Sequence, residues 1–276
     1  MRRSRGTIVF GYGVAGGFAL FAVFPVLWAL ITSLKLERDI ITPHIVFIPN
    51  PVTLHNYVAI WTQSNLPALM ANSAITTVIT VLLCVGAGTP AAYSVSRYRY
   101  RGRTNIMLFY LVLRMFPVVL MVIPLFIILR NLSLLDTHFG LALAYTAFLL
   151  PIFIWMMKGF FDAVPPDLEE AARIDGCSRM GAMFRVVLPL VQGGLWACAV
   201  FTGISAWNEY LFALMLTTSS GSRTWPVGLQ LMVGEFQLPW GALSAGGILS
   251  ILPVLVLFAF VQRSMVRGLA AGAVKG

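Results

Sequence analysis

The sequence predicts an all-α fold: a polytopic membrane protein that forms a single domain over residues 1–276. Three observations predict it. Apolar residues make up 59% of the chain and charged residues only 11%, whereas soluble domains carry about a quarter charged residues. The apolar residues form long continuous runs, and the basic residues gather where these runs end. A soluble globule could not bury so much apolar surface, so that class is excluded.

Six apolar runs are long enough to cross a bilayer as helices, which takes about 20 residues. We expect spans at about 9–33, 68–93, 105–129, 139–158, 191–216 and 242–262. The first run is longer than the core of a signal peptide, about 7–15 residues, so we expect it to remain as a helix. Prolines within or beside the spans predict kinks, at Pro25, Pro90, Pro117, Pro124, Pro151 and Pro253.

The basic residues predict the orientation. Fourteen of the 19 lie on one side of the expected spans and four on the other, with Arg114 inside a span. By the positive-inside rule both termini and the loop 159–186 are cytoplasmic. Loops at about 34–67, 130–138 and 217–241 then face outward. Because membrane topology accounts for the basic residues, the net charge of +9 does not indicate nucleic-acid binding.

The cytoplasmic loop contains an acidic segment, PPDLEEAARIDG (165–176), which holds four of the ten acidic residues. Pro165-Pro166 blocks a helix that arrives from upstream. Asp167, with Glu170 three residues later, predicts a capping box at the start of a new helix. Gly176 is expected to end or bend that helix.

A second short helix with one apolar stripe is expected after Gly176, formed by Met180, Met183, Phe184, Val187 and Leu188. Pro189 marks the return to the membrane. In the first helix Glu169, Glu170 and Arg173 are expected to point outward. A loop lying on the bilayer is the alternative, but such loops favour basic faces. Four carboxylates favour a protein partner over lipid. A helix with exposed Met and Phe side chains could bind in a groove of that partner.

The loop also resembles a known family. Its residues fit the pattern E-A-A-x3-G-x9-I-x-L-P of the EAA loop in ABC importer permeases, with Val186 in place of Ile, at Glu170-Ala171-Ala172, Gly176 and Leu188-Pro189. The fuller EEAARIDG…FRVVLPL is similar to the carbohydrate-uptake, MalG-like permeases. Further similar segments are Asn72-Ser73, RMFPVVLMVIPLF (114–126), AWNEYLFAL (206–214) and GLAAGAVKG (268–276). Departures are Cys177, where Ala is usual, and Gly193-Gly194, where Pro-Gly is frequent.

The resemblance implies a permease subunit of an ATP-driven, binding-protein-dependent importer for a sugar, polyol or oligosaccharide. It implies a bacterial or archaeal inner membrane, a second and non-identical permease, two copies of a cytoplasmic ATPase, and an extracytoplasmic solute-binding protein. The chain itself would bind no cofactor or metal, with ATP and Mg on the ATPase. The EAA loop would couple ATPase closure to alternating access. The coupling residues would be Glu169, Glu170, Ala171, Ala172, Asp175, Gly176, Met180, Met183, Phe184, Leu188 and Pro189.

A translocation pathway is expected near ionisable residues inside spans. Arg114 and Glu209 qualify, although Arg114 could instead extend toward the cytoplasmic side and Glu209 could be interfacial. Hydroxyl, amide and aromatic groups in the spans could bind a sugar. The expected pathway residues are Asn72, Ser73, Thr76, Arg114, Trp155, Trp207, Asn208 and Glu209.

The outward loop 217–241 resembles the loop of MalG-like permeases that reaches toward the binding protein. The expected contacts are Ser222, Arg223, Trp225 and Gln230. A lid packed on its own bundle is the alternative.

No catalytic constellation is found. A P-loop needs Lys followed by Ser or Thr, and all three lysines are followed by Leu or Gly. HExxH, GxSxG and CxxC are absent as well. A permease for glycerol-phosphate or another small solute, a non-transport membrane scaffold and a membrane-embedded enzyme remain as alternatives. The sequence does not identify the solute.

Overall fold

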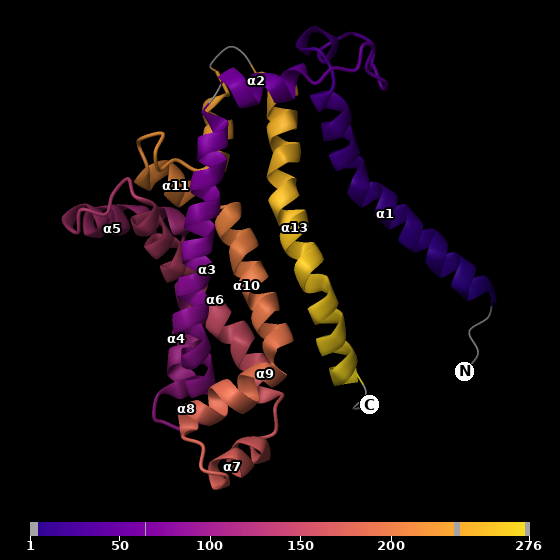
Figure 1. Cartoon of the computed structure of the whole chain (residues 1–276). Coiled ribbons are helices and arrows are strands. Elements are labelled where there is room, and N and C mark those ends of the chain that lie inside the picture. Colours follow the sequence, from indigo (N-terminus) through magenta and orange to yellow (C-terminus); the bar gives the residue numbers. More distant parts are fainter. Residues whose placement is uncertain (1–4, 64, 235–237, 274–276) are drawn as a thin grey trace. The chain divides into compact units, whose positions relative to one another are not determined.

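The computed structural model describes residues 5–63, 65–234 and 238–273, and every regular element in these ranges is helical (Figure 1). Side chains are described for the same ranges except residues 5–9, 63, 111, 114 and 260–273. The long helices are α1 (Arg5–Ser33), α3 (Leu66–Arg97), α6 (His138–Asp162), α10 (Gln192–Trp207) and α13 (Trp240–Ala273). The shorter elements are η1 (Glu37–Asp39), α2 (His55–Gln63), α4 (Arg103–Met115), α5 (Val118–Asn131), α7 (Asp167–Ile174), α8 (Arg179–Ala182), η2 (Met183–Val187), α9 (Leu188–Leu190), α11 (Leu211–Leu216) and α12 (Trp225–Leu231).

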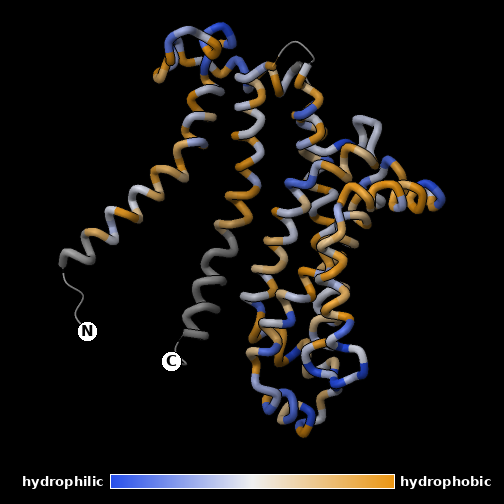
Figure 2. The backbone as a smooth tube through the Cα atoms, turned by 180° about the vertical axis from the view of Figure 1, so that it is seen from behind, coloured by the Kyte–Doolittle hydropathy of each residue, from blue (hydrophilic) through white to orange (hydrophobic). Residues whose placement is uncertain are grey.

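Four described helices are long and apolar enough to cross a membrane, in α1, α3, α6 and α13. The number rises to five if Arg179–Leu190 and Gln192–Trp207, which meet at an angle of 81°, form one broken span. Figure 2 shows that hydrophobic residues dominate the coloured parts of these helices, while hydrophilic residues gather in the loops and in the segment around α7 and α8. The expected spans 68–93 and 139–158 lie inside single helices.

The expected span 105–129 is not one helix, which corrects the sequence analysis. It divides into α4 and α5 at Phe116 and Pro117. Phe116 is extended, with φ −69° and ψ 132°, because a proline disfavours helical geometry in the residue before it. The expected span 191–216 divides in the same way into α10 and α11, with a break at residues 208–210.

The chain forms two compact units, and the larger comprises residues 68–228 and 254–276. Its main core contains the fully buried side chains of Phe153, Phe161 and Met183. Two glycines allow helices to approach α6 closely. A Cβ at Gly88 in α3 would lie 2.4 Å from the Phe153 ring, and one at Gly194 in α10 would lie 2.3 Å from the Phe160 ring. The unusual Gly193-Gly194 pair therefore has a packing reason at its second residue.

The smaller unit comprises residues 1–67 and 229–253. Most apolar side chains of α1 are exposed, and burial begins only at Thr32 and Ser33, as expected for a helix that faces hydrocarbon. The end of α1 is fixed by Asn56, whose amide donates to the carbonyls of Ser33 (2.9 Å) and Lys35 (2.8 Å). The Glu37 carboxylate accepts the N–H groups of Trp240 (2.8 Å) and Gly241 (3.0 Å) at the start of α13, where a negative charge stabilises a helix.

Candidate functional site

The EAA motif lies on a short helical hairpin that follows α6. Helix α7 carries Glu170-Ala171-Ala172, a turn at Gly176 reverses the chain, and α8 leads through η2 and α9 into α10 (Figure 1). We call residues 163–190 the hairpin. It belongs to the larger unit together with α3, α6 and α10.

The start of α7 differs from the expected capping box. No side chain caps the helix, and the Pro166 carbonyl accepts the N–H groups of Glu169 (2.9 Å) and Glu170 (3.1 Å). Pro166 already has helical angles, φ −59° and ψ −29°. Asp167 therefore lies inside the first turn, where its carboxylate stabilises the helix dipole rather than capping a backbone donor.

The end of α7 is as the sequence predicts. Gly176 has φ +91°, in the left-handed region that favours glycine. Its N–H donates to the Arg173 carbonyl (3.1 Å), and the Cys177 N–H donates to the Ala172 carbonyl (3.0 Å). These two bonds form a Schellman motif. The Ser178 hydroxyl then accepts the Gly181 N–H (3.0 Å) and caps α8. The sequence analysis missed this cap, although serine before a short helix is its usual signal.

Glu169 points into the protein, so its expected outward direction is wrong. Its carboxylate forms an ion pair with the Arg97 guanidinium and accepts a hydrogen bond of 2.7 Å from the Tyr93 hydroxyl. Arg97 also donates to the Val164 carbonyl (2.8 Å). Both side chains of the ion pair are only 11% exposed.

This arrangement fixes the hairpin to the end of α3. Glu169 and Ala172 are one turn apart on the buried face of α7. The carboxylate can be buried because it is paired and hydrogen-bonded. No local pattern could have indicated these partners, since Arg97 precedes Glu169 by 72 residues. We call Glu169, Arg97 and Tyr93 the latch.

The apolar side chains in the second half of the hairpin, residues 180–188, divide between a buried and an exposed face. Met183 and Val187 are fully buried in the core, whereas Met180 and Phe184 are 50% and 53% exposed. Residues 183–187 form a π turn, which changes the spacing of side chains around a helix. The single Met/Phe face that the sequence predicts is therefore wrong. Leu188 is half-buried, while Pro189 is exposed.

An acidic and apolar surface remains exposed on the hairpin. Glu170, Ala171 and Asp175 are exposed on or just after α7. Large apolar side chains of the same hairpin are exposed as well, at Leu168 (44% exposed), Ile174 (86%), Met180 and Phe184. A cavity of about 200 Å³ opens beside it, lined by Tyr93, Arg97, Tyr98, Pro166, Glu169, Glu170, Arg173 and Arg179. Large exposed apolar side chains beside charged ones are typical of a protein contact.

Asn72 and Ser73, expected in the pathway, form hydrogen bonds that hold a loop. The Asn72 amide donates to the carbonyls of Ser220 (3.0 Å) and Arg223 (2.9 Å). The Ser73 hydroxyl accepts the Trp225 N–H (2.7 Å). The structure thus joins two groups of residues to which the sequence analysis gave separate roles.

Asp136, which the sequence analysis missed, holds the same loop. Its carboxylate accepts the N–H groups of Thr218 (2.8 Å) and Ser219 (3.0 Å) and the Ser222 hydroxyl. Burial raises the pKa of the Asp136 carboxyl, but the hydrogen bonds from Ser219, Ser222 and Thr218 outweigh it and hold that pKa well below its usual range.

The expected contacts with a binding protein change accordingly. Ser222 and Trp225 are buried, 2% and 0% exposed, so a partner could not touch their side chains in this conformation. Arg223 is half-buried and Gln230 is exposed. The first half of the loop therefore packs on its own unit, as the alternative predicted.

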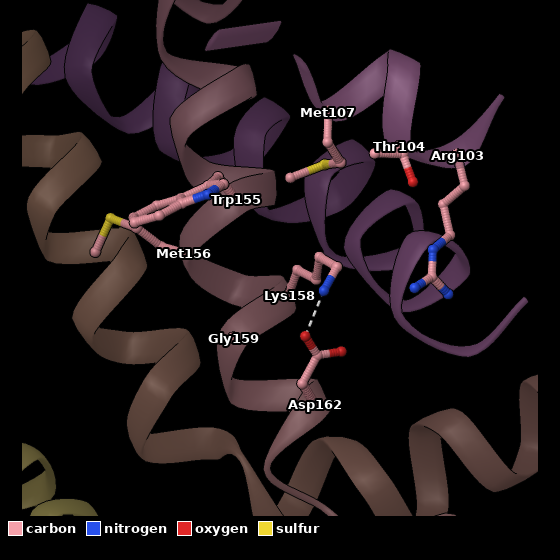
Figure 3. Close-up of a pocket in the computed structure, with 8 residues that line it drawn as sticks. All are labelled: Arg103, Thr104, Met107, Trp155, Met156, Lys158, Gly159 and Asp162. Atoms are coloured by element: carbon pink, nitrogen blue, oxygen red, sulfur yellow. Dashed lines mark hydrogen bonds and ion pairs between the residues drawn. The ribbon is translucent and has the colours of Figure 1, made fainter.

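The other expected pathway residues lie in several parts of the larger unit. Thr76 and Trp207 are buried. The Asn208 amide donates to the Ile204 carbonyl (2.9 Å). The Glu209 carboxylate accepts the N–H groups of Phe212 (2.8 Å) and Ala213 (3.1 Å) at the start of α11. The Arg114 side chain lies outside the described residues, so its place in the pathway stays a prediction. Trp155 lines a separate cavity near the C-terminal end of α6 (Figure 3). Among the described residues, no three His, Cys, Asp or Glu side chains could hold a metal ion.

Known proteins are similar to this chain in sequence. Residues 84–270 match the family described as the binding-protein-dependent transport system inner membrane component. The chain is 38% identical over 254 residues to a sulfoquinovosyl glycerol transport system permease protein, SmoH, of Agrobacterium fabrum, covering 92% of this chain and 89% of that protein. It is 36% identical to a trehalose/maltose transport system permease protein, MalG, of Thermococcus litoralis, covering 94% and 93%.

A solved structure supports the fold. A chain in the crystal structure of a bacterial ABC transporter involved in the import of the acidic polysaccharide alginate has a TM-score of 0.79 and 24% identity, covering 95% of this chain and 99% of that one. The matched family region includes the whole EAA hairpin. The hairpin and the apolar helices are thus parts of a transport protein, and the chain belongs to the family of binding-protein-dependent transport system inner membrane components.

Proposed function

We propose that this chain is a permease subunit of an ATP-driven importer and that its hairpin couples the importer to a separate ATPase. One observation supports this proposal most directly. The hairpin exposes Glu170 and neighbouring side chains on one side, and on its buried side the latch fixes it to α3. A surface that contacts a partner and a rigid connection behind it are what transmission of movement requires.

The latch gives the movement a path. A displacement of α7 reaches α3 through Glu169 and Arg97. The second half of the hairpin connects to α6 through the buried Met183 and Val187, and it continues directly into α10. Closure of two ATPase copies would move the hairpins, and the helices would then alternate between inward-open and outward-open states.

The remaining parts of the proposal follow from the family. The chain crosses the inner membrane six times if α4–α5 and α10–α11 each make one broken span, with both termini in the cytoplasm. It pairs with a second permease and receives its solute from an extracytoplasmic binding protein. ATP and Mg are bound by the ATPase. Arg114 and Glu209 remain candidates for the pathway, and Arg223 and Gln230 remain candidates for contact with the binding protein.

The substrate class we propose is a sugar, polyol or oligosaccharide. The relatives named above are permeases for a sulfoquinovosyl glycerol and for trehalose or maltose, and these solutes share glycosidic hydroxyl-rich chemistry. A permease for glycerol-phosphate is the alternative, and neither relative named above has that solute in its name.

Uptake by cells that lack this chain tests the proposal. Removal of the chain should abolish uptake of at least one labelled oligosaccharide, polyol or glycoside, and the wild-type chain should restore it. Loss of glycerol 3-phosphate uptake alone would overturn the sugar assignment and keep the transport function. Unchanged uptake of every solute would favour a non-transport scaffold.

A further inference from the structure

A second cavity lies apart from the latch and from the loop that Asp136 holds. It has a volume of about 460 Å³ between the start of α4 and the last turns of α6 (Figure 3). Its lining residues are Arg103, Thr104, Met107, Trp155, Met156, Lys158, Gly159 and Asp162. Lys158 forms an ion pair with Asp162, and Asp162 also accepts the Ser96 hydroxyl (2.6 Å).

An adjoining cavity of about 480 Å³ is lined by the segment 99–105 and shares Arg103 and Thr104 with the first. Four basic side chains line the two cavities, and the one acidic side chain among the lining residues, Asp162, is already paired with Lys158. Within the described part of the chain, Arg99, Arg101 and Arg103 form no ion pair with a carboxylate. The basic groups therefore have charge available for an anion.

An exposed apolar surface continues from these cavities along α4. Leu108, Phe109, Val112 and Met115 are 54%, 58%, 55% and 83% exposed. Trp155, which is 53% exposed, stands at the edge of the cavity, a position that tryptophan favours at the boundary between hydrocarbon and headgroups. A site that is cationic at one end and apolar along its length matches a molecule with an anionic headgroup and hydrocarbon chains.

We propose that the two cavities bind the headgroup of an anionic phospholipid, whose acyl chains lie along α4. The phosphate would interact with Arg103 and with the basic residues beside it. A zwitterionic headgroup would bring its own cation close to these residues, so the site should prefer a net negative lipid. With the proposed orientation the site lies in the cytoplasmic leaflet, and only this placement rests on the proposed function. The binding chemistry is independent of transport.

Native mass spectrometry of the full chain in mild detergent tests the site. Dioleoyl phosphatidylglycerol should be retained more tightly than dioleoyl phosphatidylcholine by the wild-type chain. One basic residue near a membrane surface contributes about fivefold in affinity, so the double variant R103Q/K158Q should bind phosphatidylglycerol roughly 25-fold more weakly. The matched control R38Q/R130Q removes the same charge outside both cavities, and it should bind like wild type. Equal losses in both variants would show a general charge effect and overturn the site.

Two further measurements separate the remaining outcomes. Arg103→Gln alone breaks no ion pair, so it replaces the double variant if loss of the Lys158 partner disturbs folding. Brominated phosphatidylglycerol should quench the wild-type chain more than a Trp155→Phe variant, because the lipid lies against Trp155. The lipid proposal would be contradicted if millimolar inorganic phosphate displaced the lipid and if the brominated lipid quenched the fluorescence of the wild-type and Trp155→Phe chains equally. The site would then bind a soluble anion.

Discussion

Replacement of Glu169 by Gln should release the hairpin from α3. The change keeps the shape of the side chain and removes its charge, so Arg97 stays buried without a counter-charge. Removal of one partner of a buried ion pair costs about 3–5 kcal/mol. The lower end, about 3 kcal/mol, applies here because Arg97 keeps its hydrogen bond to the Val164 carbonyl and because Gln can still accept from Tyr93.

A cost of about 3 kcal/mol corresponds to roughly a 150-fold shift toward the released hairpin. Amide hydrogen exchange reports such local opening directly. In the Glu169→Gln chain, residues 167–174 should exchange up to about 150-fold faster, while the core of α6 should be unchanged. Transport in the assembled importer should fall, because the hairpin would move without α3.

Two variants control this experiment. Glu170→Gln makes the same chemical change on the exposed neighbour and should leave exchange in the isolated chain unchanged. The double variant Arg97→Gln/Glu169→Gln removes both buried charges, so it should be less destabilised than the sum of the two single variants. The latch would be refuted if residues 167–174 of the Glu169→Gln chain exchanged their amide hydrogens at the wild-type rate. It would also be refuted if the losses of stability in the two single variants simply added in the double variant.

Three other perturbations test separate parts of the account. Asp136→Asn should free the loop 217–222, with a cost of about 2 kcal/mol from weakened charge-assisted hydrogen bonds, measured as faster amide exchange there. Folding lowers the pKa of the Asp136 carboxyl. The stabilisation that this carboxylate gives to the loop is therefore complete above the unfolded pKa of about 3.9, and it is lost as the pH falls through the folded pKa. A decline in the amide protection of the loop between pH 8 and pH 5 would contradict this. Gly176→Val should disorder the turn at a cost of about 1–3 kcal/mol. The cause is the φ of +91° and not crowding, since no atom lies within 4 Å of an added Cβ. Gly176→Asn should be milder, because asparagine tolerates this conformation, and equal effects of the two variants would contradict this cause. Glu170→Lys should abolish solute uptake at normal membrane insertion, and normal uptake at normal expression would exclude a role for this charge.

Local sequence signals predicted the features that depend on neighbouring residues. The helical class, the existence of the hairpin and its turn follow from apolar runs and from Gly176, because each acts within a few positions. The break at Pro117 was also visible as a proline, but only the structure shows that it divides the helix rather than kinking it.

Features that depend on distant residues could not be predicted. The direction of Glu169 is set by Arg97 and Tyr93 at the end of α3. The polar residues Asn72 and Ser73 suggested a pathway, because nothing in the sequence indicates that a loop about 150 positions later needs their hydrogen bonds. The same limitation concealed Asp136, because the hydrogen-bond partners of its carboxylate lie 82 or more residues away.

The proposed coupling role of the hairpin requires that its exposed surface bind an ATPase. The most direct measurement is gentle extraction of the tagged chain from its native membrane, followed by identification of the proteins that co-purify. The account predicts a P-loop ATPase and a second permease, with the ATPase lost selectively from the Glu170→Lys chain. A wild-type chain that carries no ATPase in several mild detergents would contradict the coupling role of the hairpin.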